Sequence, residues 1–523
     1  MATLSGGNPV SVPSPREAGP EEQSGSAAPE TANEPAADGS HRPDSSPAAA
    51  RPTRWKAPRL AGRTVPARLR WFTLGVVLLT CVLAAVSLSA ALGARATWNA
   101  VGQRQAPQVV DATGLYQALT DLDAQSANLM MFGADPTFTA DRRTALAQYA
   151  TDRSTADHDL QQATLDAAGN LSAQRALAAV LDGMGSYQDL TGRALALNDA
   201  GHQAAGHPAP AALALYRQAT DLMRGSLLPA ADQLVQANND AYNSTYAGER
   251  SALGTAEWVS LAVGLCLLAG LLGLQLWLAG RFRRIVNPPL AAATLLVLVL
   301  VGLAGSLFSD QSEYLRSGRR DAFDSVVALS RARAVSYDAN ADESRYLLDQ
   351  GRATQYQDAF ESKSQQILAL PQAGITDYDA ALAAAVTSYQ SNHADVRFAG
   401  FYGTEFRNIT FTGERAAAEQ TLAAYRTYET DDRKIRALAA QGQLHQAIAY
   451  DTSYATGGSN ADFGAHDAAL TKLIGINSAA FQTAFHDGTG ELDVRIPLLA
   501  AGAAIIVVLG LFGVRPRLAE FRR

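Results

Sequence analysis

The sequence predicts an all-α membrane protein in which four transmembrane helices carry two tandem extracytoplasmic antiparallel helical bundles related by internal duplication. Four apolar stretches contain no charged residue, and each has about the 20 residues that a helix needs to cross a bilayer. They are residues 71–94, 258–280, 290–308 and 496–514. Between them, long polar stretches place apolar residues at helical spacing. Each half of the chain also repeats the same order of span, polar segment and span.

The N-terminal segment, residues 1–70, is rich in proline and alanine and almost lacks large apolar residues. Such a segment cannot bury enough surface to offset its chain entropy, so we expect a disordered tail. Its end, residues 51–70, carries only basic charges. Because positive residues flank membrane spans on the cytoplasmic side, this end predicts a cytoplasmic N-terminus before the first span, residues 71–94.

The connector between the second and third spans, residues 281–289, is short and basic. It holds three arginines and no acid, which places it in the cytoplasm as a hairpin turn. Pro288 and Pro289 suit the first turn of the next helix, where a missing N–H costs nothing. The C-terminal tail, residues 515–523, is basic as well. We therefore expect a protein of the bacterial cell membrane with both termini on the cytoplasmic side. A cytoplasmic effector would face Arg281, Arg283, Arg284, Arg515 and Arg517.

The two segments expected outside, residues 95–257 and 309–495, contain more acidic than basic residues. In the first, glycine and proline breaks predict helices at 95–133, 137–166, 171–201 and 210–257. In the second, they predict helices at 309–350, 353–370, 376–400, 414–440, 443–454 and 460–495, with a loop at Gly400–Gly413. The first and last helices of each bundle should continue from the membrane spans, because no strong helix breaker separates them.

Residue patterns support an internal duplication. Tyr187 is followed by Arg193 and an alanine- and leucine-rich stretch, just as Tyr428 is followed by Lys434 and a similar stretch. A second match steps by four residues along the last helix of each bundle. It pairs Leu234, Asn238, Tyr242 and Tyr246 with Leu473, Asn477, Phe481 and Phe485. The offset between the halves is nearly constant, as a duplication would leave it.

Several function classes are disfavoured. The chain has no phosphate-binding glycine loop, no zinc-protease motif and no nucleophile elbow, and its histidines are scattered. We therefore expect no enzyme, no cofactor and no bound metal. The acidic bundles argue against nucleic acid. The uncharged spans argue against a transporter, which usually places ionisable groups inside its helix bundle.

The most unusual stretch is Arg331–Leu348, where small and polar residues occupy the positions of a helix-packing seam. Such a seam could line a pocket for a small polar ligand or set a register between helices. We single out Arg333, Tyr337, Asn340 and Ser344 as a candidate ligand or partner seam. The alternative is an ordinary bundle helix with a solvated face, on which Arg345 pairs locally with Asp342 or Asp349.

The architecture resembles that of the GlnX-like actinobacterial four-span membrane proteins. The likeness covers roughly residues 70–523, and it includes the short arginine-rich hairpin, the YDANADESRYLL stretch and the RPRLAEFRR ending. This resemblance implies a sensor relay. A solute-binding lipoprotein outside, similar to GlnH, would contact the bundles, and a cytoplasmic serine/threonine kinase, similar to PknG, would receive the signal. The resemblance carries over no functional residues.

The sequence thus favours a transmembrane signal relay that lies in a lipid bilayer and passes an extracytoplasmic signal to a separate effector. A non-signalling envelope scaffold or assembly protein is the alternative, and a transporter subunit is a third reading. The ligand, the effector and the formation of a homo-oligomer all stay open.

Overall fold

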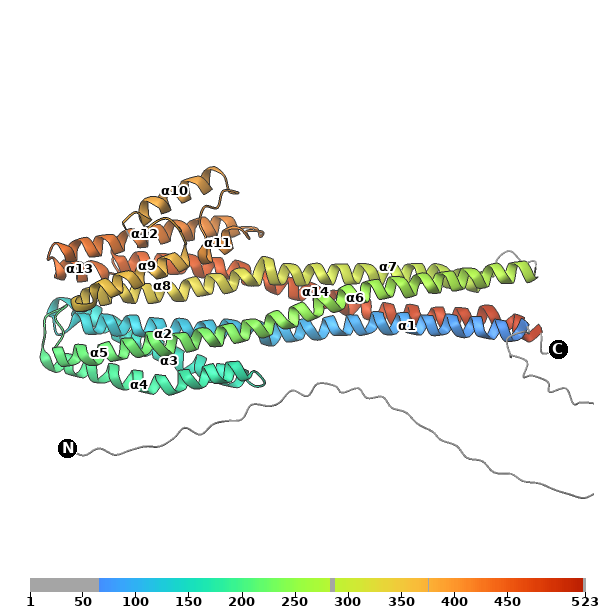
Figure 1. Ribbon diagram of the computed structural model, residues 1–523, viewed down its shortest axis with the longest axis horizontal. Coiled ribbons are helices and arrows are strands. Elements are labelled where there is room, and N and C mark those ends of the chain that lie inside the picture. Colours follow the sequence, from blue (N-terminus) through green and yellow to red (C-terminus); the bar gives the residue numbers. More distant parts are fainter. Residues whose placement is uncertain (1–64, 283–286, 375, 521–523) are drawn as a thin grey trace, which may run out of the picture. The chain divides into compact units, whose positions relative to one another are not determined.

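The computed structural model describes residues 65–282, 287–374 and 376–520, and these residues are almost entirely helical (Figure 1). No β-strand occurs among them; Ala369 and Ala399 form only an isolated bridge. The predicted all-α membrane class is confirmed. Residues 1–64 of the predicted disordered tail lie outside the described residues.

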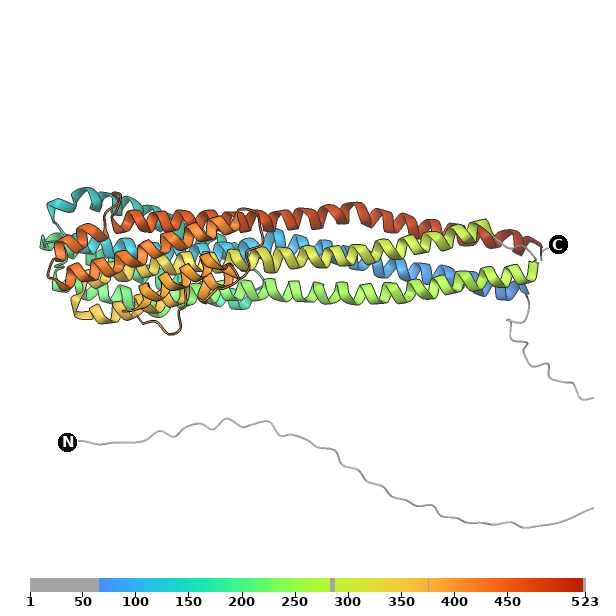
Figure 2. The same cartoon turned by 90° about the horizontal axis from the view of Figure 1, so that it is seen from above.

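Four helices are long and apolar enough to cross a membrane. They are α1 (Val65–Ala100), α6 (Leu228–Phe282), α7 (Pro288–Arg316) and α14 (Ser459–Glu520). Helix α1 packs against α6 and α14, and α7 packs against the same two helices, so the four form a ring (Figures 1 and 2). Buried leucine, valine and alanine side chains fill its centre. The protein is therefore a multi-pass membrane protein.

The starts of α7 and α1 show how the chain begins the helices of this membrane bundle. Pro288 and Pro289 occupy the first turn of α7, as predicted. Helix α1 starts at Val65, inside the segment that we assigned to the disordered tail. Pro66 fits a first helical turn, and Leu69 is fully buried in the membrane core, so the helix extends to include it.

The first bundle lies beyond the membrane-spanning segments. It consists of α2 (Ala106–Phe132), the short 3₁₀ helix η2 (Pro136–Phe138), α3 (Thr139–Asp166), α4 (Leu171–Gly201), α5 (Pro210–Leu222) and the first part of α6. Helix α2 packs against α3 and α6, and α4 packs against α5 and α6. These helices follow the predicted ranges closely.

The second bundle contains more and shorter helices. They are α8 (Asp324–Leu348), η5 (Gln350–Arg352), α9 (Ala353–Ile367), α10 (Tyr378–Ser391), α11 (Gly400–Phe406), α12 (Glu414–Ala440), α13 (Leu444–Asp451) and the first part of α14. The predicted loop at Gly400–Gly413 is wrong in its first half, which is α11. Tyr402 and Phe406 lie one helical turn apart and are buried against other aromatic rings, which stabilises this short helix.

The predicted helix at 376–400 ends earlier, at Ser391. The chain then runs in an extended segment and turns at Gly400, whose φ angle is +75°. A Cβ atom there would lie 2.6 Å from the carbonyl oxygen of Gln366, so only glycine fits this turn.

Continuous helices connect the membrane bundle to both outer bundles, as predicted. The helical stretches run over Val65–Phe132, Pro210–Gly280, Pro288–Leu348 and Ser459–Ala519. In three places the helix widens to π geometry without breaking: η1 (Val101–Gln105), η3 (Met223–Leu227) and η4 (Ser317–Phe323). Segments η1 and η4 occupy matching places, each directly after a membrane-spanning helix. No residue pattern predicted these π segments, which often occur at functional positions.

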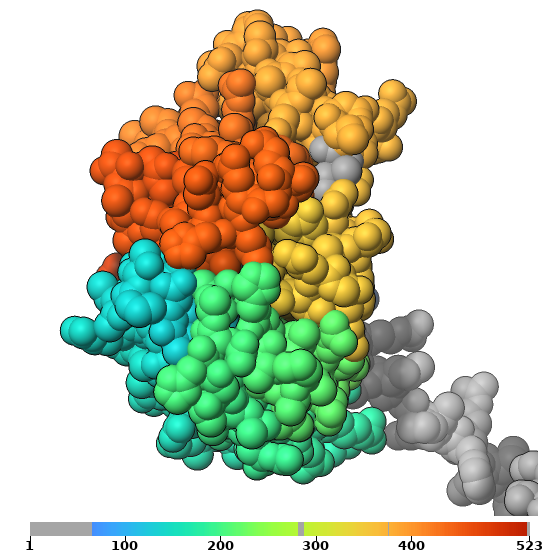
Figure 3. Space-filling model, turned by 90° about the vertical axis from the view of Figure 1, so that its left-hand side faces the viewer, coloured from blue at the N-terminus to red at the C-terminus, as the bar shows by residue number. Residues whose placement is uncertain are grey.

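The two bundles pack against one another through α2 and α8. Figure 3 shows this arrangement from the end of the molecule, with the cyan and green first bundle against the yellow and orange second bundle. Several residues that suggested a duplication are buried in both halves: Tyr187 and Tyr428 are fully buried, as are Leu234 and Leu473. Conserved packing at paired positions fits the duplication.

Candidate functional site

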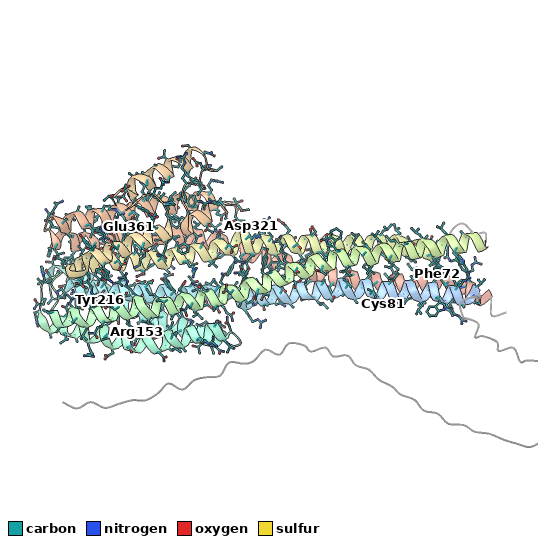
Figure 4. The ribbon with its side chains drawn as sticks, in the orientation of Figure 1. Phe72, Cys81, Arg153, Tyr216, Asp321 and Glu361 are labelled. Carbon is teal, nitrogen blue, oxygen red and sulfur yellow. The ribbon has the colours of Figure 1, made fainter. Side chains whose placement is uncertain are left out.

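The contact between α2 and α8, which we call the interbundle interface, is buried and strongly polar. From Ala118 to Phe132, every residue of α2 is buried. Most of α8 is buried as well, including acidic, basic and amide side chains. A helix of small and polar residues cannot pack as a dry apolar seam, so its polar groups must find partners inside the protein. Figure 4 shows where the two bundles lie, with Tyr216 in the first and Glu361 in the second.

Arg345 of α8 is the centre of the interbundle interface. Its side chain is completely buried and pairs with Asp123 of α2, which is 1% exposed. A second guanidinium nitrogen of Arg345 lies 2.6 Å from Asp342, one helical turn away. This arginine therefore joins the two bundles through charge-assisted hydrogen bonds, which are the strong kind.

Lys363 of α9 and Tyr187 of α4 complete this network. The Lys363 ammonium lies 2.7 Å from Asp338 and also pairs with Asp342. The Tyr187 hydroxyl donates to Asp123 over 3.0 Å. Burial raises the pKa of Asp123, and Arg345 opposes that shift. Burial also raises the pKa of Asp342, but the combined effect of Lys363 and Arg345 lowers it overall. The network is thus a buried set of charges from three helices, α2, α8 and α9, to which α4 adds the Tyr187 hydroxyl.

The four candidate seam residues of α8 all have partners inside the protein. Arg333 Nη2 donates to Asp467 of α14 over 2.8 Å, and Arg333 Nη1 donates to Gln117 of α2 over 2.9 Å. The Tyr337 ring packs edge-on against Phe463, with centroids 4.9 Å apart. Arg333 therefore links both bundles.

The other two candidates, Asn340 and Ser344, lie deeper in the interface. Asn340 donates to Glu343 over 3.2 Å. The Ser344 hydroxyl lies 2.8 Å from the Asn128 amide oxygen of α2 and 3.1 Å from a carboxylate oxygen of Asp451 in α13. Ser344 therefore also touches both bundles. Whether any of the four binds a ligand or partner stays a prediction.

Three of the predicted effector-facing arginines, Arg281, Arg515 and Arg517, lie at the other end of the described part of the chain. Arg283 and Arg284 fall outside the described residues. Arg281 belongs to the last turn of α6. Arg515 is exposed and Arg517 is half-buried, both within α14.

Sequence reasoning missed the central network. It did not single out Asp123, and it offered Arg345 as a surface residue with local partners. The local pair with Asp342 exists, but it is buried. Asp349 instead pairs with Arg217 of α5. Lysine is scarce in the chain, and this could have drawn attention to Lys363. A lysine ammonium group that is buried in a helix bundle needs an acidic partner.

A second polar cluster joins the four membrane helices close to where they continue into the two bundles. Trp98 of α1 is buried, and its indole N–H donates to Gln311 of α7 over 2.9 Å. The Gln311 amide donates in turn to the Gly488 carbonyl and to Glu491, both of α14, over 3.0 Å. On the remaining helix, Glu249 of α6 accepts a hydrogen bond from α1. All four membrane helices are thus connected at this level.

A carboxyl pair, Asp121 of α2 and Asp152 of α3, lies beside the interbundle interface. Gln125 donates to Asp121 over 3.3 Å, and Gln148 donates to Asp152 over 2.7 Å. Burial and then the charge of Asp152 raise the pKa of Asp121 to about 8. Burial raises the pKa of Asp152 to about 6. The folded protein therefore holds protons here that an unfolded chain would release at neutral pH.

We expect Asp121→Asn to raise the thermal unfolding midpoint more at pH 8 than at pH 5. A carboxyl group whose pKa is higher in the folded state than in the unfolded chain loses stability as pH rises between those two values. Asparagine resembles the protonated acid and can still accept from Gln125, so the gain at pH 8 should be on the order of 2 kcal/mol. Thermal unfolding in lipid nanodiscs at both pH values measures it.

Asp189→Asn provides the matched control, because Asp189 is exposed and pairs only with a neighbour on its own helix. It should shift the midpoint little at either pH. An equal gain for Asp121→Asn at pH 5 and pH 8 would contradict the pH argument.

Among the residues that the structure describes, no group of histidine, cysteine or acidic side chains has an arrangement that could hold a metal ion. Residues 97–247, which contain the first bundle, match the family model of the actinobacterial sensor domain. This match supports an actinobacterial sensor protein with a sensing role. No curated protein and no solved structure matches the chain.

Proposed function

We propose that this protein is a transmembrane signal relay. The two bundles receive a signal outside the cell, the four membrane helices carry it across the bilayer, and a separate cytoplasmic effector responds to it. The sensor-domain match to the first bundle supports the sensing step. The basic hairpin and tail support cytoplasmic ends, by the positive-inside rule.

The observation that carries this proposal is the continuity of the helices at the interbundle interface. Helix α2 continues from α1, and α8 continues from α7, each through one π-helical turn. Signalling proteins commonly use helix shifts of about 1–2 Å at packed interfaces. A shift of α2 against α8 would therefore displace two of the four membrane helices relative to one another.

Partners follow from the resemblance to GlnX-like proteins. A solute-binding lipoprotein similar to GlnH would dock on the bundles, and a serine/threonine kinase similar to PknG would contact the cytoplasmic ends. The candidate contacts there are Arg281, Arg283, Arg284, Arg515 and Arg517. Crosslinking in native membranes, followed by mass spectrometry, tests this pairing. Recovery of envelope-assembly proteins alone would favour the scaffold alternative.

The relay itself can be tested without knowing either partner. Gln117 is half-buried and contacts Arg333 across the interbundle interface, so Gln117→Trp should wedge α2 and α8 apart. Spin labels at Trp71 of α1 and Leu295 of α7, both 65% exposed, report on the membrane helices. Cys81 and Cys266 are exposed and are first replaced by alanine. We expect the wedge to shift the distance distribution between the labels, as measured by pulsed electron paramagnetic resonance.

Gln162→Trp is the matched control. Gln162 is also half-buried, but it lies on α3 and bonds within its own helix, to Asp166. It should leave the label distance unchanged. If both wedges leave the distance unchanged while the protein stays folded, the bundles are not coupled to the membrane helices and the relay proposal fails.

A further inference from the structure

A cavity of about 420 Å³ lies between the two bundles, on the face of α8 next to the interbundle network. Its walls come from α2, η3 and α6 on one side and from α8, α9 and α11 on the other. Pockets of this size bind small molecules. None of the four candidate seam residues lines it. Because both bundles supply its walls, a ligand bound there would contact both.

Charges of both signs face this cavity. Arg224 of η3 and Arg331 of α8 provide two guanidinium groups, and Asp232 of α6 and Asp338 of α8 provide two carboxylates. Arg331 and Asp232 form an ion pair between the bundles. The four formal charges sum to zero, and Asp338 also pairs with Lys363.

Two of the polar groups have capacity left for a ligand. Arg224 makes no ion pair within the part of the chain that the structure describes, and its guanidinium lies only over the Tyr356 ring, 6.0 Å from the centroid. The Tyr116 hydroxyl makes no hydrogen bond to any described residue. Burial, together with the charges of Asp338 and Asp232, raises the pKa of Tyr116, so this hydroxyl is a donor among those carboxylates.

Apart from Thr113 and Gln366, the rest of the wall is apolar. Leucine, valine and phenylalanine side chains line it, namely Leu228, Val235, Val335 and Phe401. An apolar wall of this kind accommodates a short hydrocarbon stem of a ligand, and a few polar groups in the wall fix the orientation of that ligand. An arginine binds a carboxylate through paired hydrogen bonds. An ammonium group would be stabilised beside the two aspartates.

We propose that this cavity binds a small zwitterion, which carries a carboxylate and an ammonium group on a short apolar stem. Arg224 binds the carboxylate, and Asp232 and Asp338 face the ammonium group. Occupancy draws η3 and α6 toward α8 and so changes the packing of the bundles. The assignment of this cavity as an input of the relay rests on the proposed function, whereas binding itself does not.

Thermal unfolding of the full chain in nanodiscs, with each standard L-amino acid at millimolar concentration, tests the proposal. We expect at least one amino acid to raise the unfolding midpoint. Its singly charged counterparts, such as isocaproate and isoamylamine for leucine, should not raise it. Failure of every amino acid, or equal stabilisation by a counterpart anion or amine, would overturn the zwitterion assignment.

Variants then locate the site. Arg224→Gln removes the guanidinium without leaving an acid unpaired, and it should weaken the affinity for the stabilising amino acid by about tenfold or more. Tyr116→Phe should weaken it less. Arg193→Gln, on the exposed face of α4, should leave the affinity unchanged. Unchanged affinity in Arg224→Gln would place the binding site elsewhere and overturn the proposal.

The two proposals fail in different ways. Absence of amino-acid binding leaves the relay with a protein input, and the spin-label experiment with Gln117→Trp still tests it. Binding that leaves the distance between labels at Trp71 and Leu295 unchanged would keep the site but count against the relay.

Discussion

Replacing Arg345 with methionine is expected to destabilise the protein by about 3–5 kcal/mol. The arginine is completely buried, and its loss leaves Asp123 without its only cationic partner among the described residues. Asp342 keeps Lys363, so the damage concentrates on the α2 side. Breaking one partner of a buried ion pair is far more damaging than replacing the whole pair with apolar groups. Thermal unfolding and limited proteolysis of the nanodisc-embedded protein measure the loss.

Arg193→Met is the control for this substitution. Arg193 and its partner Asp189 are both more than 60% exposed, and such pairs contribute at most about 1 kcal/mol. A second test uses the pair itself: adding Asp123→Asn to Arg345→Met removes the unpaired charge. The double variant should therefore be more stable than Arg345→Met alone. If the two effects simply add, Asp123 and Arg345 do not interact and the interbundle network is not coupled.

A buried charge network does not maximise stability, since well-packed apolar side chains often stabilise more. Its value here is that it specifies one register. Arg345 can satisfy Asp123 of α2 and Asp342 of α8 in one arrangement, and Ser344 has a partner on each side of it. A small shift of α2 along α8 breaks several of these bonds together. Such an interface has discrete arrangements rather than a continuous range, as a switching element requires.

Much of the fold followed from short-range patterns. The apolar spans, the prolines at the start of α7 and the glycine and proline breaks between helices each depend on neighbouring residues, so sequence reasoning placed most helix ends within a few positions. The π segments were missed because no residue pattern distinguishes one wide turn from its α-helical neighbours. Helix α11 was missed because distant aromatic rings stabilise it.

The site was harder to predict for a related reason. The α8 stretch stood out by its polar seam, but which side chains it meets depends on how α2 packs against it. Asp123 and Arg345 are more than 200 residues apart in the chain. A single sequence gives no information about such pairs. Charged residues on a helix are usually solvated, so the prediction from neighbouring residues placed Arg345 and its acidic partners on the surface. In the structure, Arg345 is the most buried cation of the interbundle interface.

Trp98→Ala is expected to destabilise the protein by about 3–5 kcal/mol, at the level where the membrane helices meet the bundles. The indole fills the space between α1, α7 and α14, and its N–H satisfies the buried Gln311. Removing it leaves a cavity and an unpaired amide oxygen. Trp258→Ala is the control: this tryptophan is 72% exposed, so the loss there should be below about 1 kcal/mol.

A compensating substitution makes this prediction specific. A Cβ atom on Gly488 would lie 2.6 Å from the Trp98 ring, so Gly488→Leu alone overpacks the site and should destabilise by about 1–3 kcal/mol. In the Trp98→Ala background the same leucine enters the vacated space, and the double variant should be more stable than Trp98→Ala. Additive losses would show that the two positions do not share this space. Because Gln311 loses its indole donor in both backgrounds, the double variant should recover stability while the hydrogen bond from α1 to α7 stays broken, which separates the contribution of packing from that of the hydrogen bond.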